Sequence, residues 1–201
     1  MKTLLHVGCG RKNIGSTTTG FMTGDWSEIR LDIDPGAQPD IVGTMTDMSN
    51  VESASVDAIY SSHNIEHLYP HDVPVALLEF KRVLTKGGFV VITCPDLQSV
   101  AELVAKDKLT EPAYNSPAGP ISPLDIIYGH RSSMSKGNLY MAHRCGFTKK
   151  VLASSLREAG FKSIATFRRV RPYFDLFALA TKEEIEEETI RKLARLHFPL
   201  S

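Results

Sequence analysis

Gly8, Cys9 and Gly10 form a short turn after the first apolar run of the chain, and Asp32 follows the second run about twenty residues later. Glycines let the backbone turn sharply and approach a ligand with no Cβ in the way. A carboxylate in this position can accept hydrogen bonds from both hydroxyls of a ribose. These residues predict a nucleoside-binding site, against the alternative of a structural tight turn with a solvated aspartate. Asp34 competes with Asp32 for the ribose role, although it fits better as a turn residue.

The residues after this turn decide which nucleoside-bearing ligand fits. A dinucleotide fingerprint would place a third glycine where Asn13 stands, and Gly15 comes too late. The phosphate-binding pattern G-x-x-x-x-G-K-[ST] is absent from the sequence. A nucleoside without a pyrophosphate therefore fits better than NAD, which leaves an NAD-dependent oxidoreductase as the weaker alternative.

A second chemical pattern, H-x-x-E-H, occupies residues 63–67. In zinc proteases this spacing places both histidines on one helix face, with the glutamate as base. Here the pattern directly follows an apolar strand, and Pro70 cuts the segment short. We therefore interpret Glu66 and His67 as packing and capping residues and expect no metal. The alternative, a zinc site, would need His71 as a further ligand.

These residues must be positioned by a sheet, because short apolar runs alternate with helical periodicity along the chain. Strands are expected over 3–7, 29–33, 40–43, 56–60, 89–93, 162–167 and 174–180, and helices over 73–84, 97–104 and 148–159. This alternation predicts an α/β fold with a mostly parallel sheet and helices on both faces. The connection between the last two strands is too short for a parallel crossover, so they should form an antiparallel terminal hairpin. Its arginines, Arg168, Arg169 and Arg171, are expected to be solvated.

Two segments interrupt this alternation. Residues 11–26 are rich in Gly, Ser and Thr and lack helical periodicity where a crossover helix is expected. Residues 110–147 contain four prolines among aromatic residues and histidines, and a connection of this length is usually a lid or a binding loop. We expect a single domain over 1–182, with 110–147 as a substrate or lid insertion. A capping box at Thr181 predicts a C-terminal helix within 183–201, which packs either on this domain or on a second copy in a homodimer.

The composition excludes several classes of protein. Lysine plus arginine and aspartate plus glutamate both number 23, so a protein that mainly grips nucleic acid is not expected. The apolar runs are far shorter than the roughly 20 residues that span a bilayer, and the N-terminal run is too short for a secretory signal. No two of the three cysteines, Cys9, Cys94 and Cys145, have the C-x-x-C spacing, which favours a reducing, cytoplasmic setting.

Four segments then occur in an order that carries a family resemblance: LHVGCG at 5–10, LDIDP at 31–35, VDAIYSSHNIEHL at 56–68 and EFKRVLTKGGF at 79–89. Over residues 3–96 the chain resembles the class I S-adenosylmethionine-dependent methyltransferases, specifically the type 11 branch. The segments HRCGFT at 143–148 and LREAGF at 156–161 are also similar to that branch. The resemblance implies a Rossmann-like seven-stranded sheet with strand seven antiparallel, and S-adenosyl-L-methionine as the cofactor.

The resemblance also implies roles for individual residues. Asp32 would hold the ribose hydroxyls and Ile33 would lie against the adenine, although core packing is the alternative for Ile33 and Met48. The other cofactor residues have implied contacts as well. The methionine portion and ribose would be contacted by Gly8, Cys9 and Gly10, the adenine by Asp47 and Met48, and the reacting methyl by Ser61, Ser62 and His63. The chain departs from the family after Gly10, where the usual helix is missing; Arg11 or Lys12 could supply a positive charge there.

The implied reaction is an in-line transfer of methyl from a sulfonium to an acceptor. The amino-group signature Asn/Asp-Pro-Pro-aromatic is absent, since the chain has SSHN at 61–64, which leaves a small-molecule, lipid or glycan acceptor. His63 and His143 are the candidate catalytic residues, with His130 a further candidate base, because imidazole titrates near neutrality. A structural histidine is the alternative for each. A non-catalytic domain that keeps the fold and the cofactor is the alternative function.

Overall fold

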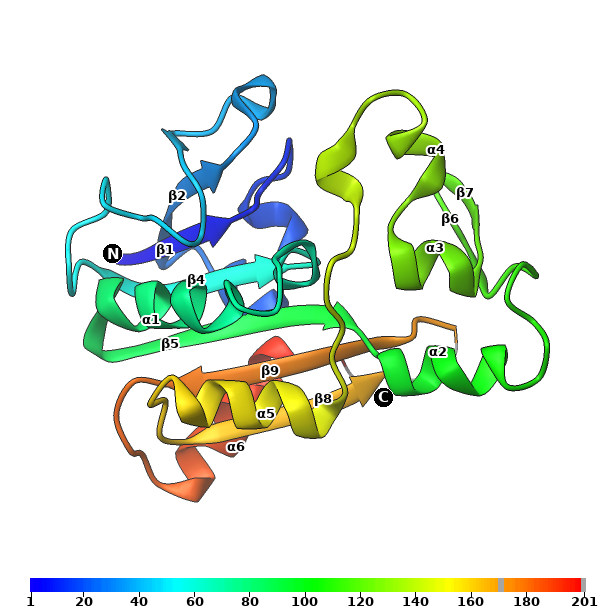
Figure 1. The fold of residues 1–201 in the computed structure, drawn as a ribbon. Helices are drawn as coiled ribbons and strands as arrows, with labels where there is room; N and C mark the ends of the chain where they lie inside the picture. The colour runs from blue at the N-terminus through cyan, green and yellow to red at the C-terminus, as the bar shows by residue number, and fades with distance from the viewer. Residues whose placement is uncertain (170–171, 200–201) are drawn as a thin grey trace.

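In the computed structural model, which describes residues 1–169 and 172–199, seven strands form one sheet in the order β3-β2-β1-β4-β5-β9-β8 (Figure 1). Their bounds are β1 Lys2–Val7, β2 Trp26–Asp32, β3 Ile41–Val42, β4 Val56–Ser62, β5 Leu84–Pro95, β8 Ile164–Arg169 and β9 Asp175–Thr181. The first five strands run parallel, and β9 pairs antiparallel with both β5 and β8. The predicted Rossmann-like sheet with an antiparallel terminal hairpin is confirmed.

Helices cover both faces of this sheet. In Figure 1, α1 (Val73–Val83) and α5 (Lys149–Glu158) lie in front of it and α6 (Glu187–His197) lies behind. One row of apolar residues on α1 is fully buried against the parallel strands, which explains the helical periodicity of this segment. α5 buries Leu152 and Leu156 in the same cluster, whereas Val151 is exposed.

The first crossover contains two 3-10 turns in place of a helix. They span Ile14–Ser16 (η1) and Thr19–Phe21 (η2) within residues 11–26, all of which the structure describes. The face that a crossover helix would cover is instead packed by α6, whose Ile190 joins the cluster around Phe21. The C-terminal helix therefore packs on its own domain. The helix begins at Glu187. Thr181 does not form the expected capping box, since its hydroxyl donates to the carbonyl of Glu183.

The insertion lies beyond the carboxyl ends of β4 and β5, beside α2 (Leu97–Val104) (Figure 1). Its elements are β6 Tyr114–Ser116, β7 Gly119–Ile121, α3 Pro123–Tyr128, α4 Arg131–Met134 and η5 Leu139–Met141. Ile121 and Ile126 pack with α2 and with Phe174 in a small apolar cluster. The insertion is thus folded over the sheet edge where ligands bind in open α/β sheets.

The arginines of the terminal hairpin were expected to be solvated, and this expectation is wrong for two of them. Arg168 pairs with the buried Asp96, which also caps α2, and Arg169 pairs with the buried Asp175. Arg171 lies outside the described residues.

None of the helices within the described ranges is long and apolar enough to cross a bilayer.

Candidate functional site

A cavity of about 290 Å³ opens at the carboxyl ends of β1 and β2, and we call it the glycine-turn cavity. Side chains and backbone from five segments of the chain line it, among them Gly8, Gly10, Asp32, Ile33, Thr44, Met45, His63 and Tyr140. Gly8 and Gly10 have φ of +64° and +54°, the left-handed region that favours glycine. A Cβ on Gly10 would meet no protein atom within 4 Å, so its absence leaves room on the cavity side of the turn.

Asp32 is held in a fixed orientation at the floor of this cavity. Its Oδ2 accepts the Gly10 N–H at 2.7 Å, and its Oδ1 accepts the Asp34 N–H at 2.9 Å. Each carboxylate oxygen has a further lone pair, so Asp32 can still accept hydrogen bonds from two ribose hydroxyls. The residues present therefore fit a nucleoside-bearing cofactor, and Asp34 takes the turn role by capping Gly36.

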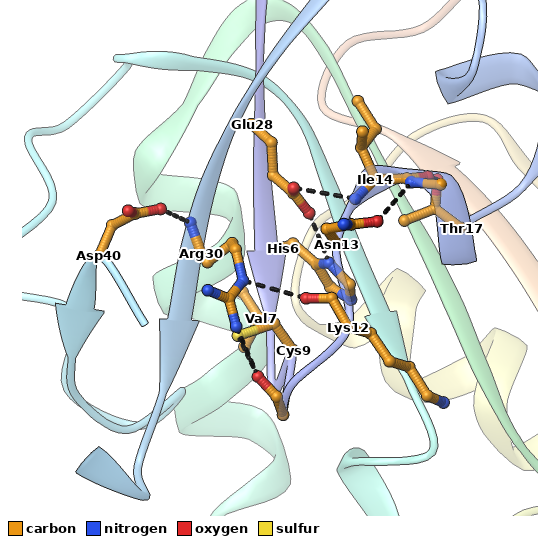
Figure 2. Close-up of polar contacts among 12 residues, drawn as sticks. His6, Val7, Cys9, Lys12, Asn13, Ile14, Thr17, Glu28, Arg30 and Asp40 are labelled. Carbon is orange, nitrogen blue, oxygen red and sulfur yellow. Dashed lines mark hydrogen bonds and ion pairs between the residues drawn. The ribbon is translucent and has the colours of Figure 1, made fainter. Parts of the chain in front are cut away.

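Two side chains of β2 hold the loop that replaces the crossover helix (Figure 2). The Arg30 guanidinium donates to the carbonyl oxygens of Gly10 at 2.7 Å and Lys12 at 3.0 Å. Glu28 accepts the Ile14 N–H and His6 Nδ1–H, both at 2.8 Å. Sequence reasoning missed both residues, although their spacing of two on a strand places them on one face of the sheet.

A third support comes from Asn64, which packs directly against Gly8 from the turn after β4. Its Nδ2 donates to the carbonyls of Val7 at 3.0 Å and Ser62 at 3.1 Å. A side chain at position 8 would overlap the Asn64 carboxamide. The first glycine is therefore required by close packing as well as by its backbone angle.

Several of the residues predicted to contact the cofactor face elsewhere. Met48 is buried in the core, and Asp47 is exposed, because the chain turns after β3 and brings Thr44 and Met45 to the cavity in their place. Three other predicted residues are not among the described lining of the cavity. Cys9 is buried, and its thiol donates to the Gly10 carbonyl oxygen. Ser61 is buried, and the Ser62 hydroxyl forms a hydrogen bond with the Thr93 hydroxyl at 2.7 Å.

A second cavity of about 400 Å³ adjoins the first, and we call it the insertion cavity. His63, His67 and Met141 line both cavities, so the two share a boundary. Its walls combine aromatic and polar side chains, including Tyr114, Ser116, His130, Ser133, Tyr173 and Phe174.

Other aromatic and basic residues of the insertion are placed differently. Tyr140 lines the glycine-turn cavity, and Tyr128 is exposed. Arg131 is paired with Asp125 at 2.7 Å, so it holds the insertion together.

His63 stands at the boundary of the two cavities in a strained backbone conformation. Its φ is +55°, which is uncommon for a residue with a Cβ and is often found at functional sites. Its side chain is 49% exposed, and Nδ1 lies 3.4 Å from Glu66 Oε1. Desolvation of the ring opposes its protonation, but the Glu66 carboxylate outweighs this effect and raises the pKa of His63.

Glu66, His67 and His143 meet below this boundary. Their potential ligand atoms all lie within 4.8 Å of one another, although His143 comes from the far end of the insertion. Burial lowers the pKa of His143, which keeps its ring neutral near pH 7. Within the described part of the chain, neither oxygen of Glu66 has a hydrogen-bond partner, so it does not act as the capping residue we expected. His71 is exposed and stacks on Tyr69, away from this group.

The comparisons with known proteins agree with this architecture. A family model described as "Methyltransferase domain" matches residues 5–92, which contain the glycine turn, Asp32 and the H-x-x-E-H segment. No curated protein matches the chain by sequence.

Solved structures resemble the whole fold. The 1,6-didemethyltoxoflavin-N1-methyltransferase of Burkholderia thailandensis, with bound 1,6-didemethyltoxoflavin and S-adenosylhomocysteine, has a TM-score of 0.58 at 17% identity; the match covers 91% of this chain and 72% of that one. A possible histamine N-methyltransferase from Thermotoga maritima has a TM-score of 0.56 at 14% identity, covering 91% and 83%. A SAM-dependent methyltransferase from Archaeoglobus fulgidus has a TM-score of 0.55 at 14% identity, covering 90% and 86%. At these identities the likeness is one of fold.

Proposed function

We propose that this chain, a class I S-adenosylmethionine-dependent methyltransferase, transfers the cofactor's methyl group to a small-molecule acceptor bound in the insertion cavity. The observation that carries the proposal is the shared boundary. A donor in the glycine-turn cavity and an acceptor in the insertion cavity would meet at His63, which lines both.

The lining of the glycine-turn cavity supports the cofactor part of this proposal. Bound S-adenosylmethionine supplies a methyl group on a sulfonium, which is already electrophilic. Asp32 would hold its ribose hydroxyls, with Ile33, Thr44 and Met45 along the adenine. The open space beside Gly10 would admit the rest of the cofactor without a side chain in its path.

The insertion cavity favours a compact acceptor with a flat ring. Its volume of about 400 Å³ lies in the lower part of the usual range for small-molecule sites, roughly 300–1,000 Å³. Tyr114 and Phe174, whose rings stack with centroids 6.4 Å apart, offer apolar surface, while His130 and Ser133 offer polar contacts. This volume is small for a glycan chain or an extended lipid.

His63 is placed to act on the acceptor's nucleophilic atom. Its ring faces the boundary with Glu66 behind Nδ1, so the acceptor would be aligned against Nε2 and would lose its proton there as the methyl group moves. Residues 110–147 would close over the acceptor and exclude water, the substrate role we expected of this insertion.

Calorimetric titration with S-adenosylhomocysteine tests the cofactor part. We expect Asp32→Asn to weaken binding about 10–100-fold, because a charged acceptor of hydrogen bonds is lost. Asp40→Asn is the matched control, since Asp40 accepts a single backbone N–H from β2 outside the cavity. Equal affinities in the two variants would contradict the assignment of Asp32.

The acceptor part is tested by measuring S-adenosylhomocysteine release with a panel of hydroxylated and amino-substituted ring compounds. With an active acceptor, Tyr114→Ala should raise the KM for that acceptor and leave cofactor affinity unchanged, since Tyr114 lines the insertion cavity and is not among the described lining of the glycine-turn cavity. His63→Gln should lower kcat at least about 100-fold, with a far smaller effect on cofactor affinity. Cofactor binding without turnover of any acceptor would instead favour the non-catalytic domain.

A further inference from the structure

Glu66 is a buried carboxylate without a hydrogen-bond partner among the described residues. The residue is 2% exposed, and neither carboxylate oxygen accepts a hydrogen bond from the described residues. A buried anion in this condition is costly unless it is paired or binds a cation. The ion-pair contact with His63 at 3.4 Å reaches one oxygen only. The carboxylate therefore has capacity for a further positive partner.

The two nearest imidazoles are arranged as metal ligands usually are. His67 Nδ1 lies 3.0 Å from the Ala142 carbonyl oxygen, and His143 Nδ1 lies 2.7 Å from that of Ile126. A carbonyl can only accept, so each Nδ1 carries the proton and each Nε2 keeps a lone pair. Ligating histidines typically donate their other ring N–H to a backbone carbonyl in this way, which fixes the tautomer and the ring orientation.

The backbone around these side chains holds the group together without a ligand. The N–H groups of Arg144 and Cys145 donate to the Glu66 carbonyl at 2.8 and 3.2 Å. The Arg144 guanidinium donates to the His67 carbonyl at 2.7 Å. The H-x-x-E-H segment and the end of the insertion are thus joined at adjacent residues, so the site is assembled before anything binds to it.

From these contacts we propose that Glu66, His67 and His143 bind a divalent transition-metal ion, with an open coordination position that faces the insertion cavity. All three side chains line that cavity, and their potential ligand atoms lie within 4.8 Å of one another. Two imidazoles and one carboxylate with a free position form a ligand set of catalytic zinc. Zinc is the first choice, and other first-row ions that accept imidazole are the competitors.

The open position would take the acceptor's nucleophilic oxygen, a role that rests on the proposed function. A metal-bound hydroxyl is a stronger acid than a free one, because the cation stabilises the developing oxyanion. His63 would receive the proton, the oxygen would form its bond to the methyl carbon, and the carbon–sulfur bond would break. The products are the methyl ether and S-adenosylhomocysteine, and the metal is unchanged. The site thus favours an acceptor with a ring hydroxyl.

The test is metal binding by tag-free protein that has been treated with a chelator. Zn²⁺ is titrated against a chromophoric chelator, and Co²⁺ is titrated with its visible absorption as the readout. We expect one equivalent of each to bind. Glu66→Gln and His143→Ala should weaken Zn²⁺ binding by more than about 100-fold, beyond the loss typical of an outer-shell contact. His71→Ala, which alters an exposed histidine next to the motif, should bind as the wild type does.

S-adenosylhomocysteine binding provides the second readout. Neither Glu66 nor His143 lines the glycine-turn cavity as described, so both variants should keep cofactor affinity if they fold. Asp32→Asn should show the reverse, with zinc affinity unchanged and S-adenosylhomocysteine affinity weakened. Failure of the wild type to bind either ion, or binding that survives His143→Ala, would overturn the metal site. A wild type that binds the metal but does not bind S-adenosylhomocysteine would overturn the proposed function and leave the metal site standing.

Discussion

Gly8→Ala is the substitution whose effect can be worked out most fully from the structure. Two costs arise at this position. The left-handed backbone is disfavoured for a residue with a Cβ by about 1–2 kcal/mol. The new Cβ would also displace the Asn64 carboxamide and leave the Val7 and Ser62 carbonyls without that donor, which costs about 1–3 kcal/mol. We expect a total loss of about 2–5 kcal/mol in the free energy of unfolding.

Gly10→Ala separates the two costs. Gly10 also has a positive φ, but its added Cβ would meet no atom within 4 Å, so only the backbone cost of about 1–2 kcal/mol remains. The same Cβ would enter the space next to the cofactor, so this variant should bind S-adenosylhomocysteine more weakly while staying more stable than Gly8→Ala.

Urea unfolding of four proteins measures the coupling directly: the wild type, Gly8→Ala, Asn64→Ala and the double variant. Once Asn64 is truncated, Gly8→Ala should cost only its backbone component, which gives an interaction energy of about 1–3 kcal/mol. The reasoning is refuted if Gly8→Ala costs the same with and without the Asn64 side chain, or if the two glycine variants are equally destabilised.

Three further predictions concern the supports of the site. Arg30→Lys should weaken S-adenosylhomocysteine binding and cost about 1–2 kcal/mol in urea unfolding, because an ammonium cannot bridge the carbonyls of the glycine-turn loop as the guanidinium fork does. Burial lowers the pKa of His197 to about 4, so its contribution to stability is complete above about pH 6.5 and is lost as the pH falls toward 4. His197→Phe should therefore flatten the fall in thermal stability over this range, by up to about 3 kcal/mol, and an unchanged slope would contradict it. Ile190→Ala should cost about 2–4 kcal/mol because the side chain is buried under the sheet, whereas Leu196→Ala on the exposed side of α6 should stay within about 0.5 kcal/mol; similar losses in both would mean that α6 does not cover this face.

The sheet could be predicted because its central strands β4, β5 and β9 are mostly buried and contain continuous apolar runs. The short connection before β9 then fixed the antiparallel pair, and the glycine turn with Asp32 located the cavity. Strand bounds were less accurate. β5 begins at Leu84 and not at Phe89, so it includes the Lys-Gly-Gly segment before the predicted strand, with a register shift between Val56 and Ala58 of its partner β4.

The sequence did not predict the conformation of the short irregular segments. β3 has only two residues, so nothing in its pattern fixes where the following turn lies. Thr44 and Met45 consequently reach the cavity where Asp47 and Met48 were expected. Turn geometry depends on tertiary contacts that single-chain patterns do not contain.

The approach of His143 to Glu66 could not be predicted either, because it depends on the path of the whole insertion. A clue was present in the sequence: the H-x-x-E-H segment follows a strand end, where ligands bind, and a third histidine precedes the segment that returns to the sheet. Pattern alone favoured a packing role for Glu66, since it does not show that the carboxylate is buried with no hydrogen-bond partner in the described part of the chain.

The substitution of α6 for a crossover helix has a consequence for the order in which the protein folds. Thr18 Oγ1 lies 2.6 Å from His197 Nδ1, a contact between residues 179 positions apart. At roughly 5–20 residues per second, a ribosome makes these residues on the order of 10–40 seconds apart. During synthesis the apolar face around Phe21 therefore stays uncovered until α6 has been made, although the neighbouring strands have already been synthesised. Chaperones that shield nascent apolar surface would have their longest opportunity to act on this face.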